Sequence, residues 1–144
     1  MNLRLENKLA LVSGSTAGIG LAIAKALASE GARVIVNGRS EARVKEAIAS
    51  IRESVPTAKL EGLALDLSKA DAAAQTTKRH PDVDILVNNL GVYEVKDFEQ
   101  ITDAEWLTII ETNFLSGVRL SRHYLPRMKA TGWGRIILSP ANRL

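Results

Sequence analysis

The chain has 144 residues, with 19 lysines and arginines, 16 aspartates and glutamates, and no cysteine. The length fits one domain with a real core, and the 46% share of hydrophobic residues excludes a disordered chain and a disulfide scaffold. The net charge of +3 is small and the basic residues are scattered, so we expect no nucleic-acid partner. No apolar run approaches the roughly 18 residues of a membrane span. The first residues do not resemble a signal peptide, so we expect a cytoplasmic protein.

Short apolar runs alternate with amphipathic stretches along the chain. In chain order, the predicted elements are a strand at 9–12, a helix at 19–30, a strand at 34–36, a helix at 40–54, a strand at 60–67, a helix at 68–79, a strand at 83–87, a loop at 91–101, a helix at 102–128 and a strand at 135–138. This alternation predicts an α/β protein with a doubly wound parallel sheet, the Rossmann fold. We expect one domain over 1–144, with about five strands and a sheet that is incomplete at its C-terminal edge.

Residues at the predicted helix ends support these boundaries. Ser40 can cap the second helix, and Gly31 ends the first. Thr102 and Glu105 have the spacing of a capping box, which predicts that the long helix begins there.

Three glycines, Gly14, Gly18 and Gly20, lie between the first predicted strand and the first helix. Glycines there let the backbone turn sharply and approach a pyrophosphate, while the helix N-terminus offers free N–H groups. A tight turn without a ligand could have the same composition. The position at the start of a strand–helix–strand unit favours a ligand.

These features make the chain similar to the N-terminal part of the short-chain dehydrogenase/reductase family, over residues 5–138. The family's Thr-Gly-x-x-x-Gly-x-Gly motif appears with Ser13 in place of threonine, and its Asn-Asn-Ala-Gly motif appears at 88–91 with leucine in place of alanine. Asp66, after the third strand, matches the residue that contacts the adenine in the family. Asn113 matches the asparagine of the family's catalytic tetrad.

The resemblance implies a cofactor site and one catalytic residue. The implied cofactor-binding residues are Gly14, Ser15, Thr16, Gly18, Ile19, Gly20, Asn37, Arg39, Asp66, Leu67, Asn89 and Gly91. Asn113 would bend its helix and hold a water molecule in a proton relay. Taken alone, Asp66 could simply cap the next helix, and Asn113 could be a solvated side chain. No metal site is indicated.

The end of the second strand bears on the choice between NAD and NADP. An acidic side chain there would bind the ribose 2′-hydroxyl and repel a 2′-phosphate. Asn37 is neutral, and Arg39 could bind a phosphate, so we expect NADP(H) to be favoured over NAD(H). Ala17 is an argument against this, because many NADP-using relatives have a basic residue in the glycine loop.

The chemistry of the family also uses a serine and a Tyr-x-x-x-Lys pair. The serine falls on Ala141, and neither Tyr93 nor Tyr124 begins a Tyr-x-x-x-Lys motif. We therefore expect a truncated or frameshifted, inactive form. Loss of one T within the codons that begin at Ile137 would convert a typical family continuation into this tail, and a deliberate truncation or a genuine short variant are the alternatives. We also expect an uncovered strand edge at 136–138 and no native-like oligomer, although full-length relatives are homo-oligomers.

Three functional hypotheses follow. The first is the cofactor-binding half of an NADP(H)-dependent oxidoreductase that acts on a small carbonyl or alcohol substrate. The second is a non-catalytic nucleotide-binding module, which the absent catalytic residues support. The third, a methyltransferase, is disfavoured by the glycine spacing, the segment at 88–91 and the lack of an acid after the second strand.

Overall fold

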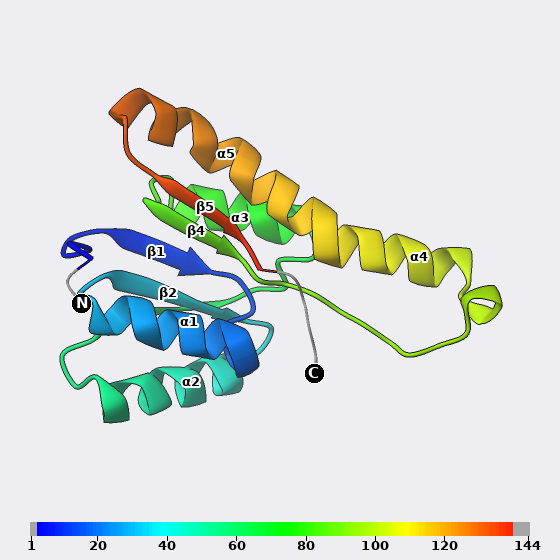
Figure 1. The fold of residues 1–144 in the computed structure, drawn as a ribbon, viewed down its shortest axis with the longest axis horizontal. Helices are drawn as coiled ribbons and strands as arrows, with labels where there is room; N and C mark the ends of the chain where they lie inside the picture. Colours follow the sequence, from blue (N-terminus) through cyan, green and yellow to red (C-terminus); the bar gives the residue numbers. More distant parts are fainter. Residues whose placement is uncertain (1–2, 140–144) are drawn as a thin grey trace.

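A computed structural model describes residues 3–139 and contains one five-stranded sheet (Figure 1). All neighbouring strands are parallel, in the order β3-β2-β1-β4-β5. The strands are β1 (Leu9–Val12), β2 (Arg33–Gly38), β3 (Lys59–Ala64), β4 (Ile85–Asn88) and β5 (Arg135–Leu138). The helices are α1 (Gly18–Ser29), α2 (Glu41–Ser54), α3 (Ala70–Arg79), α4 (Asp103–Ile110) and α5 (Ser116–Thr131), with the 3₁₀ turn η1 (Phe98–Gln100) and the π-helix η2 (Glu111–Leu115). The predicted fold class is confirmed.

Helices cover both faces of the sheet because successive strand residues point to opposite sides. Ala10 and Val12 pack in a core with α1 and α2, whereas Leu11, between them, packs in a second core with α3 and α5. Figure 1 shows α1 and α2 on one side of the sheet and α3 and α5 on the other. Strands buried on both faces explain the unbroken apolar runs in the sequence.

The long helix predicted over 102–128 is three segments in the structure. α4 and α5 are joined by η2, whose backbone forms π-type turns. The predicted capping box at its start is confirmed: Thr102 accepts a hydrogen bond from the backbone of Glu105, whose side chain accepts one in return. Ser40 likewise caps α2 by accepting a hydrogen bond from the backbone of Arg43. The predicted strand at 60–67 is shorter than expected, because residues beyond Ala64 leave the sheet.

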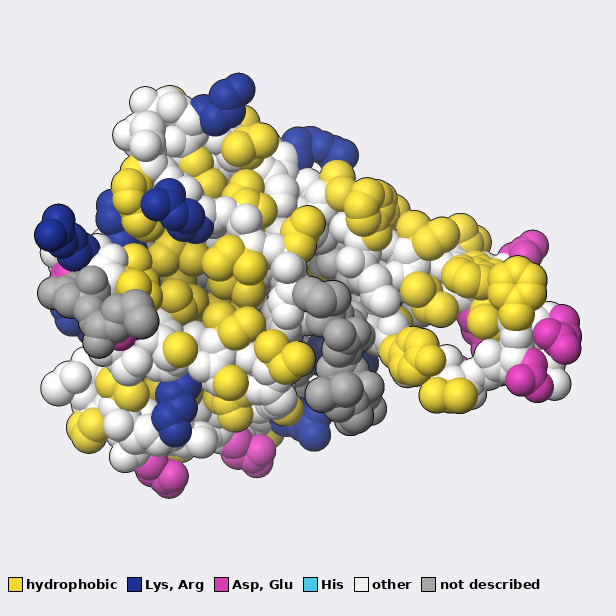
Figure 2. Space-filling model, viewed as in Figure 1, with side chains coloured by type: hydrophobic (Ala, Val, Ile, Leu, Met, Phe, Trp, Pro, Cys, Tyr) yellow, Lys and Arg dark blue, Asp and Glu magenta, His cyan; other side chains and the backbone are white. Residues whose placement is uncertain are grey.

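β5 lies at one edge of the sheet, and within residues 3–139 it pairs with β4 alone. Ile137 and Leu138 are 45% and 73% exposed, so part of the apolar surface of this edge is open to solvent, whereas Ile136 packs against the second core. α4 projects away from the sheet beside that edge (Figures 1 and 2). No helix in the described part of the chain is long and apolar enough to cross a bilayer. Ala141, on which the family's serine falls, lies outside the described residues.

Candidate cofactor site

The glycine loop between β1 and α1 adopts a backbone conformation that requires its glycines. Gly14 and Gly18 have φ angles of 61° and 55°, in the left-handed region that a side chain with a Cβ rarely adopts. A Cβ on Gly20 would overlap the carbonyl oxygen of Gly14 and the side-chain nitrogen Nδ2 of Asn89. Around Gly18, by contrast, no described atom lies within 4 Å of such a Cβ. The loop is therefore tightly packed beneath Gly20 and open at Gly18.

α1 begins in this open region. Its N-cap residue, Ala17, has an extended backbone and provides no side-chain hydrogen bond to the first turn. The first N–H groups of a helix have no intrahelical acceptor. The backbone at Gly18 and at the exposed Ile19 can therefore donate hydrogen bonds to an anion, aided by the positive end of the helix dipole.

Ser15 and Asn37 support the loop from within the protein. Both are buried, at 0% and 1% exposure. The Ser15 hydroxyl donates to the carbonyl of Val12 over 2.7 Å and accepts from the backbone amide of Asn37 over 2.8 Å. The backbone amide of Ser15 donates in turn to the carbonyl of Asn37 over 2.8 Å. The side chain of Ser15 thus both donates and accepts a hydrogen bond in holding the loop on the end of β2.

The side chain of Asn37, a predicted cofactor-binding residue, points into the protein. Its Oδ1 accepts from the backbone amide of Gly14 over 3.0 Å. Its Nδ2 donates to the carbonyls of Leu63 and Leu65, each over 3.0 Å. Because the side chain points inward, Asn37 supports the glycine loop and β3. The residue at the open end of β2 is Gly38, where a Cβ would overlap the side chain of Thr16.

Arg39 follows Gly38 and is exposed at the carboxyl end of β2, before α2 begins. Thr16 lies in the glycine loop against Gly38, so Arg39 and the loop belong to the same edge of the sheet. Ligands of open α/β sheets bind at this edge, beyond the carboxyl ends of the strands. A guanidinium at this position can form charge-assisted hydrogen bonds with a phosphate.

Asn89 connects β4 to the glycine loop. Its backbone amide donates to the Ser13 hydroxyl over 2.9 Å. Its Nδ2 donates to the carbonyls of Ser13 and Gly14 over 3.2 and 3.1 Å. The side chain of Ser13 also donates to the carbonyl of Val87 over 3.3 Å. Serine therefore supplies here a hydroxyl that links β1 to β4, and the two predicted motifs meet in one hydrogen-bond network.

Asp66 and Leu67 lie in the turn that follows β3. Oδ1 of Asp66 accepts from the backbone amide of Ser68 over 3.1 Å and from its hydroxyl over 2.7 Å. Leu67 is buried in the core beside α3. Asp66 is partly exposed, whereas Leu67 and Ser68 are buried, so the carboxylate of Asp66 is a polar group that this turn can present to a ligand.

Asn113 lies within η2 and fixes the segment that follows Asn89. Its Oδ1 accepts from the backbone amide of Val92 over 2.8 Å, and its Nδ2 donates to the carbonyl of Val92 over 2.9 Å. The exposed Gly91 precedes Val92 directly. π-Helical turns are often found at functional sites. Here the π-helix places the amide of Asn113 against the backbone next to the second predicted motif.

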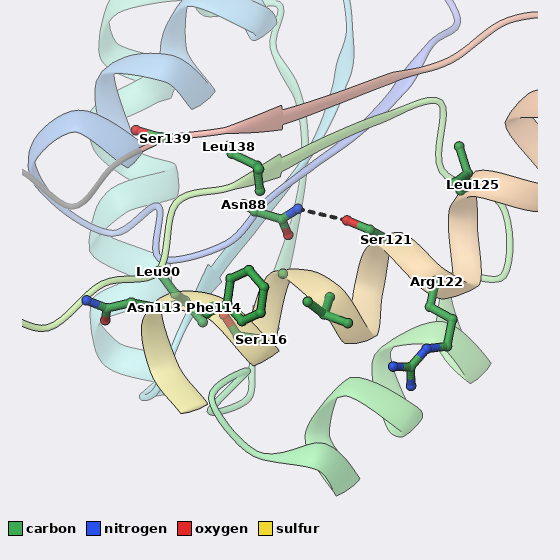
Figure 3. A pocket seen from close by; sticks show the side chains of 12 residues that line it. Asn88, Leu90, Asn113, Phe114, Ser116, Ser121, Arg122, Leu125, Leu138 and Ser139 are labelled. Atoms are coloured by element: carbon green, nitrogen blue, oxygen red, sulfur yellow. Dashed lines mark hydrogen bonds between the residues drawn. The ribbon is translucent and has the colours of Figure 1, made fainter. Parts of the chain in front are cut away.

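A cavity of about 520 Å³ lies between η2, α5 and the end of β5 (Figure 3). Asn88 and Asn113 line it together with apolar side chains that include Phe114 and Leu138. Nδ2 of Asn88 donates to the Ser121 hydroxyl over 3.1 Å, while its buried Oδ1 has no partner among the described residues. The cavity is also lined by Leu90, which lies between the predicted cofactor-binding residues Asn89 and Gly91.

Two polar residues of this region were not predicted from the sequence to belong to the site. Ser121, on α5, holds Asn88, and Arg119, also on α5, donates to the carbonyl of Ser68. Each contact joins residues far apart in the sequence, so helical periodicity alone carried no signal for it. A polar residue on the sheet-facing side of a helix was the single available indication for Ser121.

Comparisons with known proteins bear on the same residues. A family model described as short chain dehydrogenase matches residues 8–139. The chain belongs to the short-chain dehydrogenase family. It is 49% identical over 140 residues to an uncharacterized oxidoreductase, YvrD, of Bacillus subtilis, covering 95% of this chain and 52% of the relative. It is 42% identical over 137 residues to D-beta-hydroxybutyrate dehydrogenase of Cupriavidus necator, covering 92% and 52%.

Solved structures of short-chain dehydrogenases also match. L-sorbose reductase of Gluconobacter frateurii, complexed with NADPH and L-sorbose, has a TM-score of 0.83 at 31% identity, covering 94% of this chain and 53% of the reductase. A metagenomic short-chain oxidoreductase in complex with NADP has a TM-score of 0.81 at 34% identity, covering 92% and 60%. The chain thus spans about half the length of these relatives.

Proposed function

We propose that this chain is the cofactor-binding half of an NADP(H)-dependent oxidoreductase that interconverts a small carbonyl compound and its alcohol. The observation that carries the proposal is the combination of an open, positive-φ Gly18 at the start of α1 with the exposed Arg39 at the end of the neighbouring strand. The pyrophosphate would bind at the first, and the 2′-phosphate at the second.

The residues present fit a dinucleotide. The backbone at Gly18 and Ile19 would bind the pyrophosphate, and the carboxylate of Asp66 would accept a hydrogen bond from the adenine. The tight packing of Gly20 against Gly14 and Asn89 would keep the loop in shape for that contact. When bound, a nicotinamide cofactor supplies hydride transfer. Asn113, fixed on Val92, would orient the segment at the reacting end of the site.

NADP(H) is favoured over NAD(H) on charge. No acidic side chain stands at Asn37, Gly38 or Arg39 to repel a 2′-phosphate. The first of these is turned inward, and a Cβ at the second would overlap Thr16, so Arg39 is the side chain that would contact the ribose. Two of the structural relatives were solved with NADPH or NADP, which supports the same choice.

A second candidate function is a nucleotide-binding module without catalysis. Tyr93 is followed in the fourth position by Asp97, and Tyr124 by Met128, so neither forms the Tyr-x-x-x-Lys pair of the family. Tyr124 is buried and its hydroxyl donates to the carbonyl of His80 over 2.7 Å. Burial, together with the negative charge of Asp82, raises the pKa of Tyr124 above its ordinary value. We propose that the 144 residues alone bind the cofactor and do not turn over substrate.

The whole oxidoreductase would be a cytoplasmic homo-oligomer. Exposed apolar side chains on the projecting α4, such as Trp106 and Leu107, support pairing through this helix (Figure 2). The 144-residue chain would provide one of the surfaces involved and not form the native oligomer by itself.

Calorimetric titration of the chain with NADPH, NADH and S-adenosylmethionine tests the proposal. We expect NADPH to bind more tightly than NADH, and S-adenosylmethionine not to bind. Binding of S-adenosylmethionine alone would instead support the methyltransferase hypothesis. Absence of binding by both dinucleotides would contradict both candidate functions. The gene sequence downstream of codon 137 tests the frameshift hypothesis, which requires a Tyr-x-x-x-Lys motif in another reading frame.

A further inference from the structure

Arg119 joins two segments that border opposite ends of the candidate cofactor site. It lies in the first turn of α5, and its side chain is 20% exposed. One terminal nitrogen, Nη1, donates to the carbonyl of Ser68 over 2.9 Å. The other, Nη2, donates to Oε1 of Glu111 over 2.7 Å. A planar guanidinium can hold two such acceptors in fixed geometry, whereas a lysine ammonium is a point charge on a flexible stem.

Each acceptor belongs to a segment already placed in the site. Ser68 donates from both its backbone and its hydroxyl to the carboxylate of Asp66, so the carbonyl that Arg119 holds belongs to the turn on the adenine side. Glu111 is the first residue of η2, the π-helix that contains Asn113. A continuous path of hydrogen bonds and backbone therefore runs from Asp66 through Arg119 to η2.

The path ends at the other predicted motif. Asn113 makes two hydrogen bonds with the backbone of Val92, next to Gly91. A π-helix departs from the regular hydrogen bonding of the helices beside it, and an ion pair at its first residue can help to hold that backbone in place. Glu111 is such an end, and Arg119 is its ion-pair partner.

We propose that Arg119 is a positioning residue that couples the turn at Asp66 to the π-helix, so that binding of the adenine end of a dinucleotide fixes Asn113 and the backbone of Val92. The inference rests on the proposed function, because it requires a nucleotide at Asp66. Beyond that function, the proposal links the turn at Asp66 to the π-helix through the side chain of Arg119, which would not itself contact the cofactor. If the contact between Arg119 and Ser68 only stabilised the fold, binding at Asp66 would have no effect on Asn113 or Val92.

The test uses the 144-residue chain with adenosine 2′,5′-bisphosphate, a fragment that contains the adenine end of NADPH and no nicotinamide. Fragment affinity is measured by calorimetry, and the amide resonance of Val92 is followed by NMR. In the unaltered chain we expect the fragment to bind and to shift this resonance. In Arg119→Met we expect the affinity to fall about tenfold, a typical coupling between linked sites, and the Val92 response to be lost. Arg119→Lys should restore part of the affinity but little of the response.

Two further variants separate coupling from stability. Arg79→Met removes an exposed arginine from α3 and should leave both affinity and response unchanged. Glu111→Gln keeps the contact between Arg119 and Ser68 but weakens the link to η2, so the fragment should bind nearly normally while the Val92 response falls. This variant also decides the matter if Arg119→Met does not fold.

The possible failures are distinguishable. If the unaltered chain binds neither NADPH nor the fragment, the proposed function is wrong, and the coupling is wrong with it. If the unaltered chain binds the fragment and Glu111→Gln keeps the full Val92 response, the coupling through Arg119 is wrong while the cofactor site stands.

Discussion

Asn37 and Gly14 are joined by a hydrogen bond in which the backbone amide of Gly14 donates to Oδ1 of Asn37 over 3.0 Å. The other end of the same side chain donates to the carbonyls of Leu63 and Leu65. One buried amide therefore holds the glycine loop, β2 and the end of β3 in a fixed relation. The shape of the open loop depends on a residue whose own side chain points into the protein.

Replacing Asn37 with aspartate should destabilise the fold strongly. Asn37→Asp keeps the size of the side chain but exchanges two N–H donors for a carboxylate oxygen that faces the carbonyls of Leu63 and Leu65. We expect a loss of about 2–4 kcal/mol in the free energy of unfolding, because a buried charge would face unpaired acceptors. Urea denaturation measures this. The same type of exchange at an exposed site, Gln75→Glu, should change stability by less than about 0.5 kcal/mol, and equal effects in the two variants would contradict the structural role of Asn37.

Two alanine variants in the glycine loop should affect different properties. One should mainly lower the stability of the fold, and the other should mainly lower the affinity for NADPH. Gly20→Ala would force a methyl group into the carbonyl of Gly14 and the amide of Asn89, and we expect it to cost about 3 kcal/mol of stability. Gly18→Ala meets no described atom and should cost about 1–2 kcal/mol, through its left-handed φ alone.

The effect on NADPH affinity, measured per folded molecule, should have the opposite order and be larger in Gly18→Ala than in Gly20→Ala. Gly18→Ala places its methyl group where a phosphate would approach the start of α1. It should therefore fold and yet lose most of its NADPH affinity. Thermal unfolding gives the stabilities, and calorimetry at a temperature where both variants are folded gives the affinities. Full NADPH affinity in Gly18→Ala would show that the phosphate binds elsewhere.

Arg39 should carry the preference for NADPH. In Arg39→Leu we expect NADPH affinity to fall by about 1.5–3 kcal/mol, the value of a hydrogen bond to a charged group, while NADH affinity changes little. The matched control is Arg52→Leu, which removes an exposed arginine from the last turn of α2. Competition titrations with both cofactors measure the ratio. An unchanged ratio in Arg39→Leu would remove the basis for assigning NADP(H).

The strands and the helices of the fold were predictable because apolar runs and their spacing report burial directly. Apolar runs do not report a buried polar residue such as Asn37. The apolar run of β2 ends at Val36, so the sequence predicts that the strand ends there and that Asn37 lies in the cofactor site. The real strand continues to Gly38, because a polar side chain can remain buried in a sheet when its hydrogen bonds are satisfied.

The π-helix was not predictable from periodicity either. Residues 111–115 continue the helical pattern of their neighbours, and only the resemblance of Asn113 to a family residue implied a bend. The contacts of Arg119 depend on a backbone carbonyl at Ser68, and no sequence pattern reports such a partner. The sequence predicts the residues of the family motifs, whereas the residues that hold those segments in place are visible only in the structure.

The start of α4 should respond to acid in a defined direction. Hydrogen bonds from Lys96 and from the backbone and hydroxyl of Thr102 lower the pKa of Glu105 from 4.5 to about 2. Because the folded pKa lies below the ordinary one, the carboxylate stabilises this segment above about pH 4.5, and the contribution is lost as the pH falls toward 2.

Amide exchange of Trp106 gives the measurement, because its N–H bonds to the carbonyl of Thr102 in the first turn of α4. Protection should decrease between pH 4.5 and 2 in the unaltered chain. In Glu105→Gln it should be weaker at neutral pH and vary less over this range. Glu99→Gln, at an exposed glutamate of the neighbouring turn η1, serves as the control and should follow the unaltered chain. A steep acid response that persists in Glu105→Gln would assign the effect to another group.

The 144-residue chain should bind NADPH without oxidising it in the presence of carbonyl compounds. Reduction of a carbonyl needs a proton donor beside the hydride donor, and positioned general acids typically contribute about 10²–10⁴-fold to the rate. Tyr124 cannot supply this proton, because it is buried among α3 and α5, donates to the carbonyl of His80 and has a raised pKa. Tyr93 is exposed and has no lysine at the family spacing.

NADPH absorbance, followed with a panel of small hydroxyketones and ketoacids, should therefore match the protein-free blank, while calorimetry on the same sample registers binding. L-sorbose reductase of Gluconobacter frateurii, assayed with NADPH and L-sorbose, the two compounds named in its solved complex, provides the positive control for the assay. If the chain consumed NADPH at a comparable rate, a residue within these 144 would have to donate the proton, and Tyr93→Phe would then be the first variant to examine. Binding without turnover would agree with both candidate functions, because neither requires a residue among these 144 to donate the proton.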